Sequence, residues 1–158
     1  LPNRQTLSDR ITMSIAASKR GKKHFFVFFI DLDGFKEVND QYGHETGDAV
    51  IIESAKRFKS CVRESDTVAR LGGDEFIILL NSIEDVNDAG AIADKILSSI
   101  SNIYEIEKIS CSISASIGIS VYPDDGNQQK DLLKAADRAM YDAKNSGKNT
   151  YKYYSNVA

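Results

Sequence analysis

The amino-acid sequence predicts an α+β fold, an α/β sandwich in which helices flank a mixed, mainly antiparallel central sheet. Three patterns lead to this prediction. Four segments repeat apolar residues at helical spacing, two short segments are continuously apolar, and one alternates apolar residues with small polar ones. The chain has 158 residues and no proline- or glycine-rich linker divides it, so we expect one domain over residues 1–158.

Four long helices are expected, and each is recognised by apolar residues three or four positions apart. Their apolar members are Leu7, Ile11 and Ile15; Val50, Ile51, Ala55, Phe58 and Val62; Ala89, Ile92, Ala93, Ile96, Leu97 and Ile100; and Leu132, Leu133, Ala136, Met140 and Ala143. A shorter helical turn is expected from Phe35 to Gln41.

The expected strands lie between these helices. Continuous apolar runs from Phe25 to Ile30 and from Phe76 to Leu80 predict central strands that are covered on both faces. The alternation from Ser110 to Val121 predicts one long strand, with Tyr104 to Lys108 as its short hairpin partner. Tyr151 to Tyr154 is expected to form an edge strand.

Charge and composition exclude several classes of protein. The 20 basic and 23 acidic side chains give a net charge of −3, whereas a domain that binds long nucleic acid is usually basic. No apolar run approaches the length of a membrane span, and no signal peptide is visible. We therefore expect a cytoplasmic domain without direct membrane contact. Its opening, Leu1-Pro2-Asn3-Arg4, suggests a segment of a longer protein, which itself could be anchored in a membrane.

Two acidic residues end the first predicted strand. Asp31 and Asp33 are two positions apart, so both side chains point to the same face of an extended chain. A carboxylate at the end of a buried strand is costly unless a cation lies beside it, and ligands gather at strand ends. The alternative is that both acids cap the following helical turn and point to solvent.

A second acidic pair, Asp74 and Glu75, follows Gly72-Gly73. The glycines suit a two-residue hairpin turn because both can take positive φ, so turn geometry alone explains them. It does not explain two acids at the start of a buried strand, where acidic residues are disfavoured. Mg²⁺ typically binds one or two carboxylates together with substrate phosphates, which can approach glycine backbone closely. Asp31 and Asp74 are therefore a candidate magnesium site.

The segment Gly-Gly-Asp-Glu-Phe at 72–76 resembles the GGDEF domain family, the diguanylate cyclases. Three further blocks are similar to the family in order and spacing: Leu-Pro-Asn-Arg at 1–4; Asp-Leu-Asp-Gly-Phe-Lys at 31–36 with Asn39-Asp40, Gly43-His44 and Gly47-Asp48; and Ala135-Ala136-Asp137 with Met140-Tyr141, Ala143-Lys144 and Ser146 to Asn149. The resemblance covers essentially the whole chain. It implies a fold like the polymerase palm and the class III nucleotide cyclases.

The resemblance implies the condensation of two GTP molecules into cyclic di-GMP with release of two pyrophosphates. By this similarity Asp31 and Asp74 bind Mg²⁺, or Mn²⁺ in its place, and the carbonyl of Leu32 assists. Glu75 then polarises the attacking 3′-hydroxyl or completes the metal shell. One domain offers one GTP site and the product needs two nucleotides, so catalysis is expected across a two-fold homodimer.

Recognition of the base follows from the same resemblance. Residues that match Asn39 and Asp48 hold guanine in the family. Asp48 would discriminate GTP from ATP, because a carboxylate accepts hydrogen bonds from guanine N1–H and N2–H₂. The alternative is that Asp48 is the N-cap of the following helix and that Asn39 is a surface turn residue.

The phosphates are expected at two places. The N–H groups of Phe35 and Lys36 open the short helix and form an anion site, and the exposed backbone of Gly72-Gly73 lies at the metal site. Lys144 and Lys148 match family positions that neutralise the triphosphate. The second is often arginine, and lysine keeps the charge without the bidentate geometry. The alternative is a basic helix C-terminus favoured by the helix dipole.

A regulatory site is also implied. Arg63 and Asp66 match the Arg-x-x-Asp site at which the family binds cyclic di-GMP as an inhibitor, and Lys95 lies near a secondary contact that is commonly arginine. By local reasoning alone, Arg63 and Asp66 form a surface ion pair that contributes little to the stability of the fold.

The leading interpretation is a Mg²⁺-dependent diguanylate cyclase domain with product feedback. The alternative is a catalytically weak module that senses GTP or cyclic di-GMP and is fused to an EAL phosphodiesterase. A third interpretation, an adenylate cyclase or polymerase palm, is less favoured because Asn39 and Asp48 suit guanine.

Overall fold

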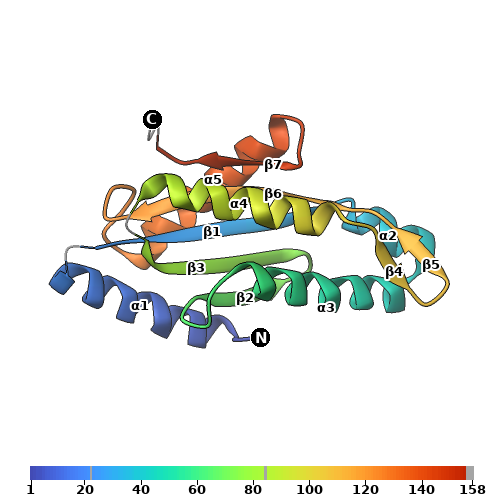
Figure 1. Ribbon diagram of the computed structural model, residues 1–158, viewed down its shortest axis with the longest axis horizontal. Coiled ribbons are helices and arrows are strands. Elements are labelled where there is room, and N and C mark those ends of the chain that lie inside the picture. The colour runs from blue at the N-terminus through green and yellow to red at the C-terminus, as the bar shows by residue number, and fades with distance from the viewer. Residues whose placement is uncertain (22, 84, 156–158) are drawn as a thin grey trace.

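The computed structural model describes residues 1–21, 23–83 and 85–155. Five strands form one sheet in the order β2-β3-β1-β6-β7, and two short strands form a separate hairpin (Figure 1). The elements in chain order are α1 (Arg4–Gly21), β1 (His24–Asp33), α2 (Phe35–Tyr42), α3 (His44–Cys61), β2 (Thr67–Gly72), β3 (Glu75–Ile83), α4 (Val86–Ser101), β4 (Tyr104–Ile106), β5 (Ile109–Cys111), β6 (Ser114–Tyr122), α5 (Gln129–Asn145) and β7 (Thr150–Tyr153).

The sheet is mixed and mainly antiparallel, as the sequence predicts. β1 lies at its centre and pairs antiparallel with both β3 and β6. β2 pairs antiparallel with β3, and β7 runs parallel to β6 at the far edge. The continuous apolar runs of β1 and β3 are explained by this position, because both faces of each strand are covered.

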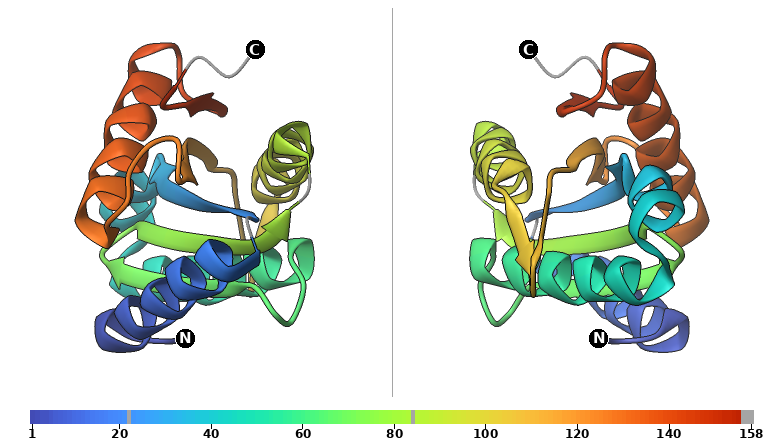
Figure 2. Two further views of the ribbon diagram at one scale, coloured as in Figure 1. Left: turned by 90° about the vertical axis from the view of Figure 1, so that its left-hand side faces the viewer. Right: turned by 90° about the vertical axis from the view of Figure 1, so that its right-hand side faces the viewer.

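Helices cover the two faces of the sheet separately (Figure 2). Even-numbered side chains from Phe26 to Leu32 pack into one core with α3 and α4, and odd-numbered ones from Phe25 to Phe29 pack into a second core with α1 and α5. Asp31 and Asp33 continue the odd-numbered set. They therefore belong to the face that α5 covers, and the alternation of β1 decides which helix they meet.

The predicted strand from Ser110 to Val121 is wrong as a single element. The structure divides it into β5 and β6, and the hairpin partner of β4 is β5. The alternation of apolar residues continues across the division, so periodicity could not reveal it. The division has a tertiary cause: Tyr104 on β4 hydrogen-bonds to Ser54 on α3 at 2.8 Å, and Arg57 lies 3.8 Å from the centre of the Tyr104 ring. These contacts hold the β4–β5 hairpin against α3.

Within the described residues, no helix has both the length and the apolar character that crossing a bilayer requires. Cys61 and Cys111 are both buried in the core under α3 and α4 as free thiols.

Candidate active site

The acidic residues at the C-terminal end of β1 and at the β2–β3 turn meet at one end of the sheet. Asp31 on β1 is opposite Glu75, the first residue of β3, in the antiparallel register. The N–H of Leu32 donates to the carbonyl of Asp74 at 3.1 Å. Asp31, Asp74 and Glu75 are therefore held together by backbone pairing between β1 and β3, as the sequence predicts for the two strand ends.

The turn between β2 and β3 differs by one residue from the predicted one. Gly72 still pairs with Glu75 across the hairpin, so the two turn residues are Gly73 and Asp74. Gly72 has a φ of 151° and Gly73 a φ of 51°, which favours glycine at both positions. A bulge between Arg70 and Gly72 shifts the register. As a result Asp74 lies at the tip of the turn itself, beside the end of β1.

Asp31 is an unusual carboxylate. Its Oδ2 pairs with the Lys144 ammonium of α5 at 3.1 Å, whereas its Oδ1 is buried and has no hydrogen-bond partner in the part of the chain that the structure describes. Burial, and then the neighbouring charge of Asp74, raise the pKa of Asp31 to about 6, although Lys144 acts in the opposite direction. The folded protein thus disfavours the charged form of a carboxylate at an open strand end. A bound cation would stabilise the charged form of such a carboxylate.

Glu75 and Lys144 respond to the same cluster of charges. Burial raises the pKa of Glu75, and Asp137 and Asp74 raise it further, against the influence of Arg4 and Lys144. Burial lowers the pKa of Lys144, but Asp31 and Asp33 outweigh that effect and leave the pKa above its ordinary value. Lys144 is therefore a firmly charged ammonium among carboxylates.

The donor set fits a divalent cation that also needs substrate oxygens. Asp31 has an orphaned oxygen and Asp74 lies next to it. Within residues 1–21, 23–83 and 85–155, no group of three or more His, Cys, Asp and Glu side chains is arranged to hold a metal ion. Two carboxylates and backbone carbonyls leave most of an octahedral shell to water and phosphate, which is the usual condition of Mg²⁺.

The raised pKa of Asp31 leads to a prediction about stability. A carboxyl whose pKa rises on folding stabilises the protein fully only below its unfolded pKa of about 3.9, and this contribution is lost as the pH rises toward 6. Asp31→Asn should therefore raise the melting temperature of the metal-free protein at pH 7.5, on the order of 2–4 °C, and change it little at pH 4. Calorimetry without divalent cations measures this.

The matched control is Asp142→Asn, which removes the same charge from an exposed ion pair with Arg138 and should have little effect at either pH. A lower melting temperature of Asp31→Asn at pH 7.5 would contradict the prediction. Added Mg²⁺ should raise the melting temperature of the wild type more than that of this variant.

Asn39 and Asp48 occupy different environments near the start of α3. The Asn39 Oδ1 is buried and accepts no hydrogen bond from any described residue. It lies directly over Gly47, where an added Cβ would meet it at 1.7 Å. Asp48 is exposed. The alternative that it caps a helix is wrong, because α3 begins at His44 with Gly43 as its N-cap. Capping therefore does not account for Asp48.

The expected phosphate contacts are arranged around the carboxylates. Phe35 and Lys36 begin α2 after Gly34, which has a φ of 87°, so their N–H groups lie at the first turn. Gly72 and Gly73 are exposed. Lys144 lies on Asp31, whereas Lys148 is exposed in the turn that follows α5.

Asp33, which the sequence predicts either beside a cation at the strand end or as a solvent-exposed cap, is buried at 5% exposure. Its oxygens accept hydrogen bonds from Ser114 and Ser116 at 2.8 Å each and from the N–H of Asn149 at 3.1 Å, and Lys144 lies at 3.5 Å. The alternative that Asp33 caps α2 and points to solvent is therefore wrong. Asp137 and Arg4, which act on the pKa of Glu75, belong to segments that resemble the family, but no role beside Glu75 was predicted for them because only the fold brings them near it.

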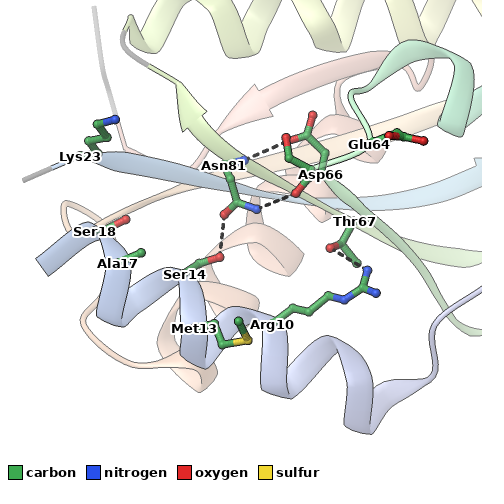
Figure 3. A pocket seen from close by; sticks show the side chains of 11 residues that line it. Arg10, Met13, Ser14, Ala17, Ser18, Lys23, Glu64, Asp66, Thr67 and Asn81 are labelled. Atoms are coloured by element: carbon green, nitrogen blue, oxygen red, sulfur yellow. Dashed lines mark hydrogen bonds between the residues drawn. The ribbon is translucent and has the colours of Figure 1, made fainter. Parts of the chain in front are cut away.

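Arg63 and Asp66 form an ion pair in the structure, and Asp66 is buried, so the pair is not confined to the surface. The Asp66 side chain is 2% exposed and accepts hydrogen bonds from the N–H of Arg63 and the N–H of Asn81. A cavity of about 370 Å³ separates this loop from α1, and Asn81 spans it by contacts to Ser14 and the Asp66 segment (Figure 3). Lys95 lies exposed on α4, with no hydrogen bond or ion pair to Arg63 or Asp66 in the described chain.

Comparison with known proteins agrees with the resemblance. Residues 1–150 match the family described as "Diguanylate cyclase, GGDEF domain". The chain is 48% identical over 154 residues to the bifunctional diguanylate cyclase/cyclic di-GMP phosphodiesterase MucR of Pseudomonas aeruginosa, covering 98% of this chain and 22% of MucR. It is 42% identical over 145 residues to the diguanylate cyclase TpbB of the same species, covering 91% of this chain and 33% of TpbB. The chain thus spans a fifth to a third of these relatives.

Solved structures agree with the fold. The crystal structure of the GGDEF domain of TpbB superposes with a TM-score of 0.94 at 39% identity, covering 97% of this chain and 96% of that one. The GGDEF domain of DgcB from Caulobacter crescentus, in complex with cyclic di-GMP, superposes with a TM-score of 0.88 at 25% identity, covering 98% and 91%. The match over 150 residues, the sheet order and the acidic hairpin together show that the chain belongs to the GGDEF family of diguanylate cyclase domains.

Proposed function

We propose that this domain condenses two GTP molecules into cyclic di-GMP and releases two pyrophosphates, in the cytoplasm. The observation that carries the proposal is the meeting of Asp31 and Asp74 at one end of the sheet, with the Asp31 Oδ1 lacking a hydrogen-bond partner among the described residues and Lys144 beside it. An acidic site that is incomplete without a cation, next to a lysine and exposed glycine backbone, suits a nucleoside triphosphate with its metal.

Asp31, Asp74 and the carbonyl of Leu32 would hold Mg²⁺, or Mn²⁺ in its place. The bound cation supplies charge for the phosphates and lowers the pKa of the attacking 3′-hydroxyl. Glu75, whose pKa is raised, would accept a proton from that hydroxyl or complete the shell. Lys144 balances charge that develops on the pyrophosphate.

The remaining residues orient the nucleotide. Asp48 would accept hydrogen bonds from guanine N1–H and N2–H₂, and the Asn39 amide would accept or donate at the same base. The exposed Asp48 has no capping role to compete with this one. The N–H groups of Phe35 and Lys36, with Lys148, would hold the phosphates. Each domain supplies one such set, so two copies must face each other around a two-fold axis to join two nucleotides.

A catalytically weak sensor is the second candidate. One observation favours it: the cyclic di-GMP phosphodiesterase NbdA of Pseudomonas aeruginosa is 32% identical over 155 residues, covering 98% of this chain and 20% of NbdA. A phosphodiesterase that contains a similar domain is the arrangement expected if the domain binds GTP and regulates a fused EAL domain.

One experiment separates the two candidates. The domain, fused to a two-fold coiled coil, is incubated with GTP and Mg²⁺, and the nucleotides are separated by chromatography. We expect cyclic di-GMP from the dimer, much less from the unfused domain, and no cyclic dinucleotide when ATP replaces GTP. Tight GTP binding without product would support the sensor, and equal consumption of ATP would contradict the assignment of Asn39 and Asp48.

Gly47→Ala is predicted to weaken GTP binding while the fold persists. The new Cβ would lie 1.7 Å from the Asn39 Oδ1, so the Asn39 side chain must leave its position. Alanine favours a helix over glycine by about 1 kcal/mol, so α3 should not unfold. We expect the dissociation constant for GTP, measured by titration calorimetry, to rise roughly tenfold or more. This rise corresponds to the binding free energy of one or two hydrogen bonds.

The control for this prediction is Glu45→Ala, an exposed change in the first turn of the same helix, which should bind GTP like the wild type. Wild-type affinity in Gly47→Ala would mean that Asn39 does not touch the base.

Arg63→Ala is predicted to weaken product feedback and to spare turnover. Arg63 is half exposed, and guanine presents O6 and N7 to a guanidinium. Asp66 is the wrong residue to change, because its removal would orphan two backbone N–H groups. We expect the cyclic di-GMP concentration for half-inhibition to rise about tenfold or more, measured as initial rate against added product. Unchanged inhibition would show that the pair is structural alone.

A further inference from the structure

We infer that Asp33 is a positioning residue, which fixes the lysine-bearing end of α5 and the turn after it against the sheet. The inference rests on the proposed function, because it assigns a purpose to Lys144 and Lys148 as phosphate-binding groups. Asp33 is a buried carboxylate, and the proposed mechanism uses it neither to hold the metal nor to contact the nucleotide.

Asp33 has the contacts of an anchor. Both of its oxygens are used: Oδ1 accepts from the Ser116 hydroxyl, and Oδ2 accepts from the Ser114 hydroxyl and from the N–H of Asn149. The serines belong to β6, the strand next to β1, and Asn149 lies between α5 and β7. One side chain thus ties the central strand to the segment that follows α5.

That segment has a backbone that needs support. Gly147, Lys148 and Asn149 have φ values of 109°, 63° and 48°. Glycine tolerates a left-handed conformation, but two consecutive residues with side chains do so only when their surroundings impose it. The N–H of Lys148 donates to the Ala143 carbonyl at 3.2 Å, and the N–H of Asn149 donates to Asp33. Asp33 therefore helps to hold the conformation that presents Lys148.

Asp33 also shares the ammonium of Lys144 with Asp31. The Nζ lies 3.1 Å from Asp31 and 3.5 Å from Asp33. A divalent cation on Asp31 would repel this ammonium, because like charges at a few ångströms oppose each other. Asp33 would then be the remaining anion that keeps Lys144 beside the phosphates. A third metal ligand is a poorer explanation of Asp33, because a metal would have to displace three hydrogen-bond donors.

The test compares Asp33→Asn and Asp33→Ala in the dimerised protein. Hydrogen exchange of the Asn149 amide measures the anchor without GTP, and KM and kcat for GTP measure its effect on catalysis. The matched control is Ser120→Ala, a buried change on β6 that removes a hydrogen bond to α5 at Leu132, away from Asp33.

We expect Asp33→Ala to speed exchange at Asn149 at least about tenfold and to raise KM for GTP roughly 10- to 100-fold with a smaller change in kcat. Asp33→Asn keeps an acceptor for the Asn149 N–H and loses the charge opposite Lys144. It should keep the slow exchange and still raise KM. Ser120→Ala should leave both quantities as in the wild type.

Wild-type exchange in Asp33→Ala, or wild-type KM in Asp33→Asn, would overturn the inference. If Asp33→Ala fails to fold, the KM of Asp33→Asn decides. If the wild type forms no cyclic di-GMP, the proposed function fails, and the dissociation constant for GTP then replaces KM while the exchange test stands.

Discussion

Asp74→Asn is expected to abolish formation of cyclic di-GMP, lowering turnover roughly 10²- to 10³-fold or more, while the protein stays folded. Asp74 is at the tip of the β2–β3 turn, where its backbone is held by Leu32 and its carboxylate faces Asp31. Asparagine fits the same turn, so the fold loses little. The site loses one of two negative charges that would bind the cation, and with it the stabilisation of charge on the phosphates.

The measurement is product formation by the dimerised variant over hours at saturating GTP, with GTP binding measured in parallel. Binding should persist within roughly tenfold, because Asn39, Asp48 and the lysines remain. Asp142→Asn, on the exposed side of α5, is the control and should keep wild-type turnover. The pKa of Asp31 should fall in Asp74→Asn, because the Asp74 charge contributes to raising it. Turnover near the wild-type level would place the metal elsewhere.

The parts of the site that the sequence predicted are those fixed by strand periodicity. Asp31 and Asp33 share a face because strand side chains alternate, and the continuous apolar runs predicted that β1 and β3 are central strands covered on both faces. The family resemblance then named the residues. Periodicity depends only on the residues of one segment, so it predicts that segment correctly wherever contacts with other elements do not change its structure.

Two of the failures come from contacts between residues far apart in the chain, and a third comes from local backbone geometry. Asp33 is anchored by Ser114 and Ser116, more than 80 positions away, and no local pattern indicates such partners. The division between β5 and β6 comes from Tyr104 and Arg57 at α3. Asp48 was a plausible helix cap by residue type, but Gly43, with a φ of 93°, begins the helix earlier.

Gly118→Ala is expected to destabilise the protein by about 2–4 kcal/mol, which lowers the melting temperature by roughly 5–15 °C. Gly118 lies on β6 where α5 crosses the sheet. An added Cβ would meet the Ala136 carbonyl oxygen at 1.9 Å and the Met140 nitrogen at 2.2 Å. Both atoms are helix backbone, so no side chain can rotate away. Glycine at a strand interior is explained here by close approach of another backbone, not by an unusual φ.

The destabilisation should be accompanied by loss of site geometry, because α5 carries Lys144 to Asp31 and Asp33. A helix that lifts off β6 also pulls this ammonium away, so any folded fraction should have a raised KM for GTP. Denaturant unfolding measures the free energy, and Ser120→Ala, which loses one buried hydrogen bond on the same strand, should cost only about 1 kcal/mol. If Gly118→Ala cost no more than Ser120→Ala, α5 would have to pack farther from the sheet, and the contact of Lys144 with the carboxylates would need another support.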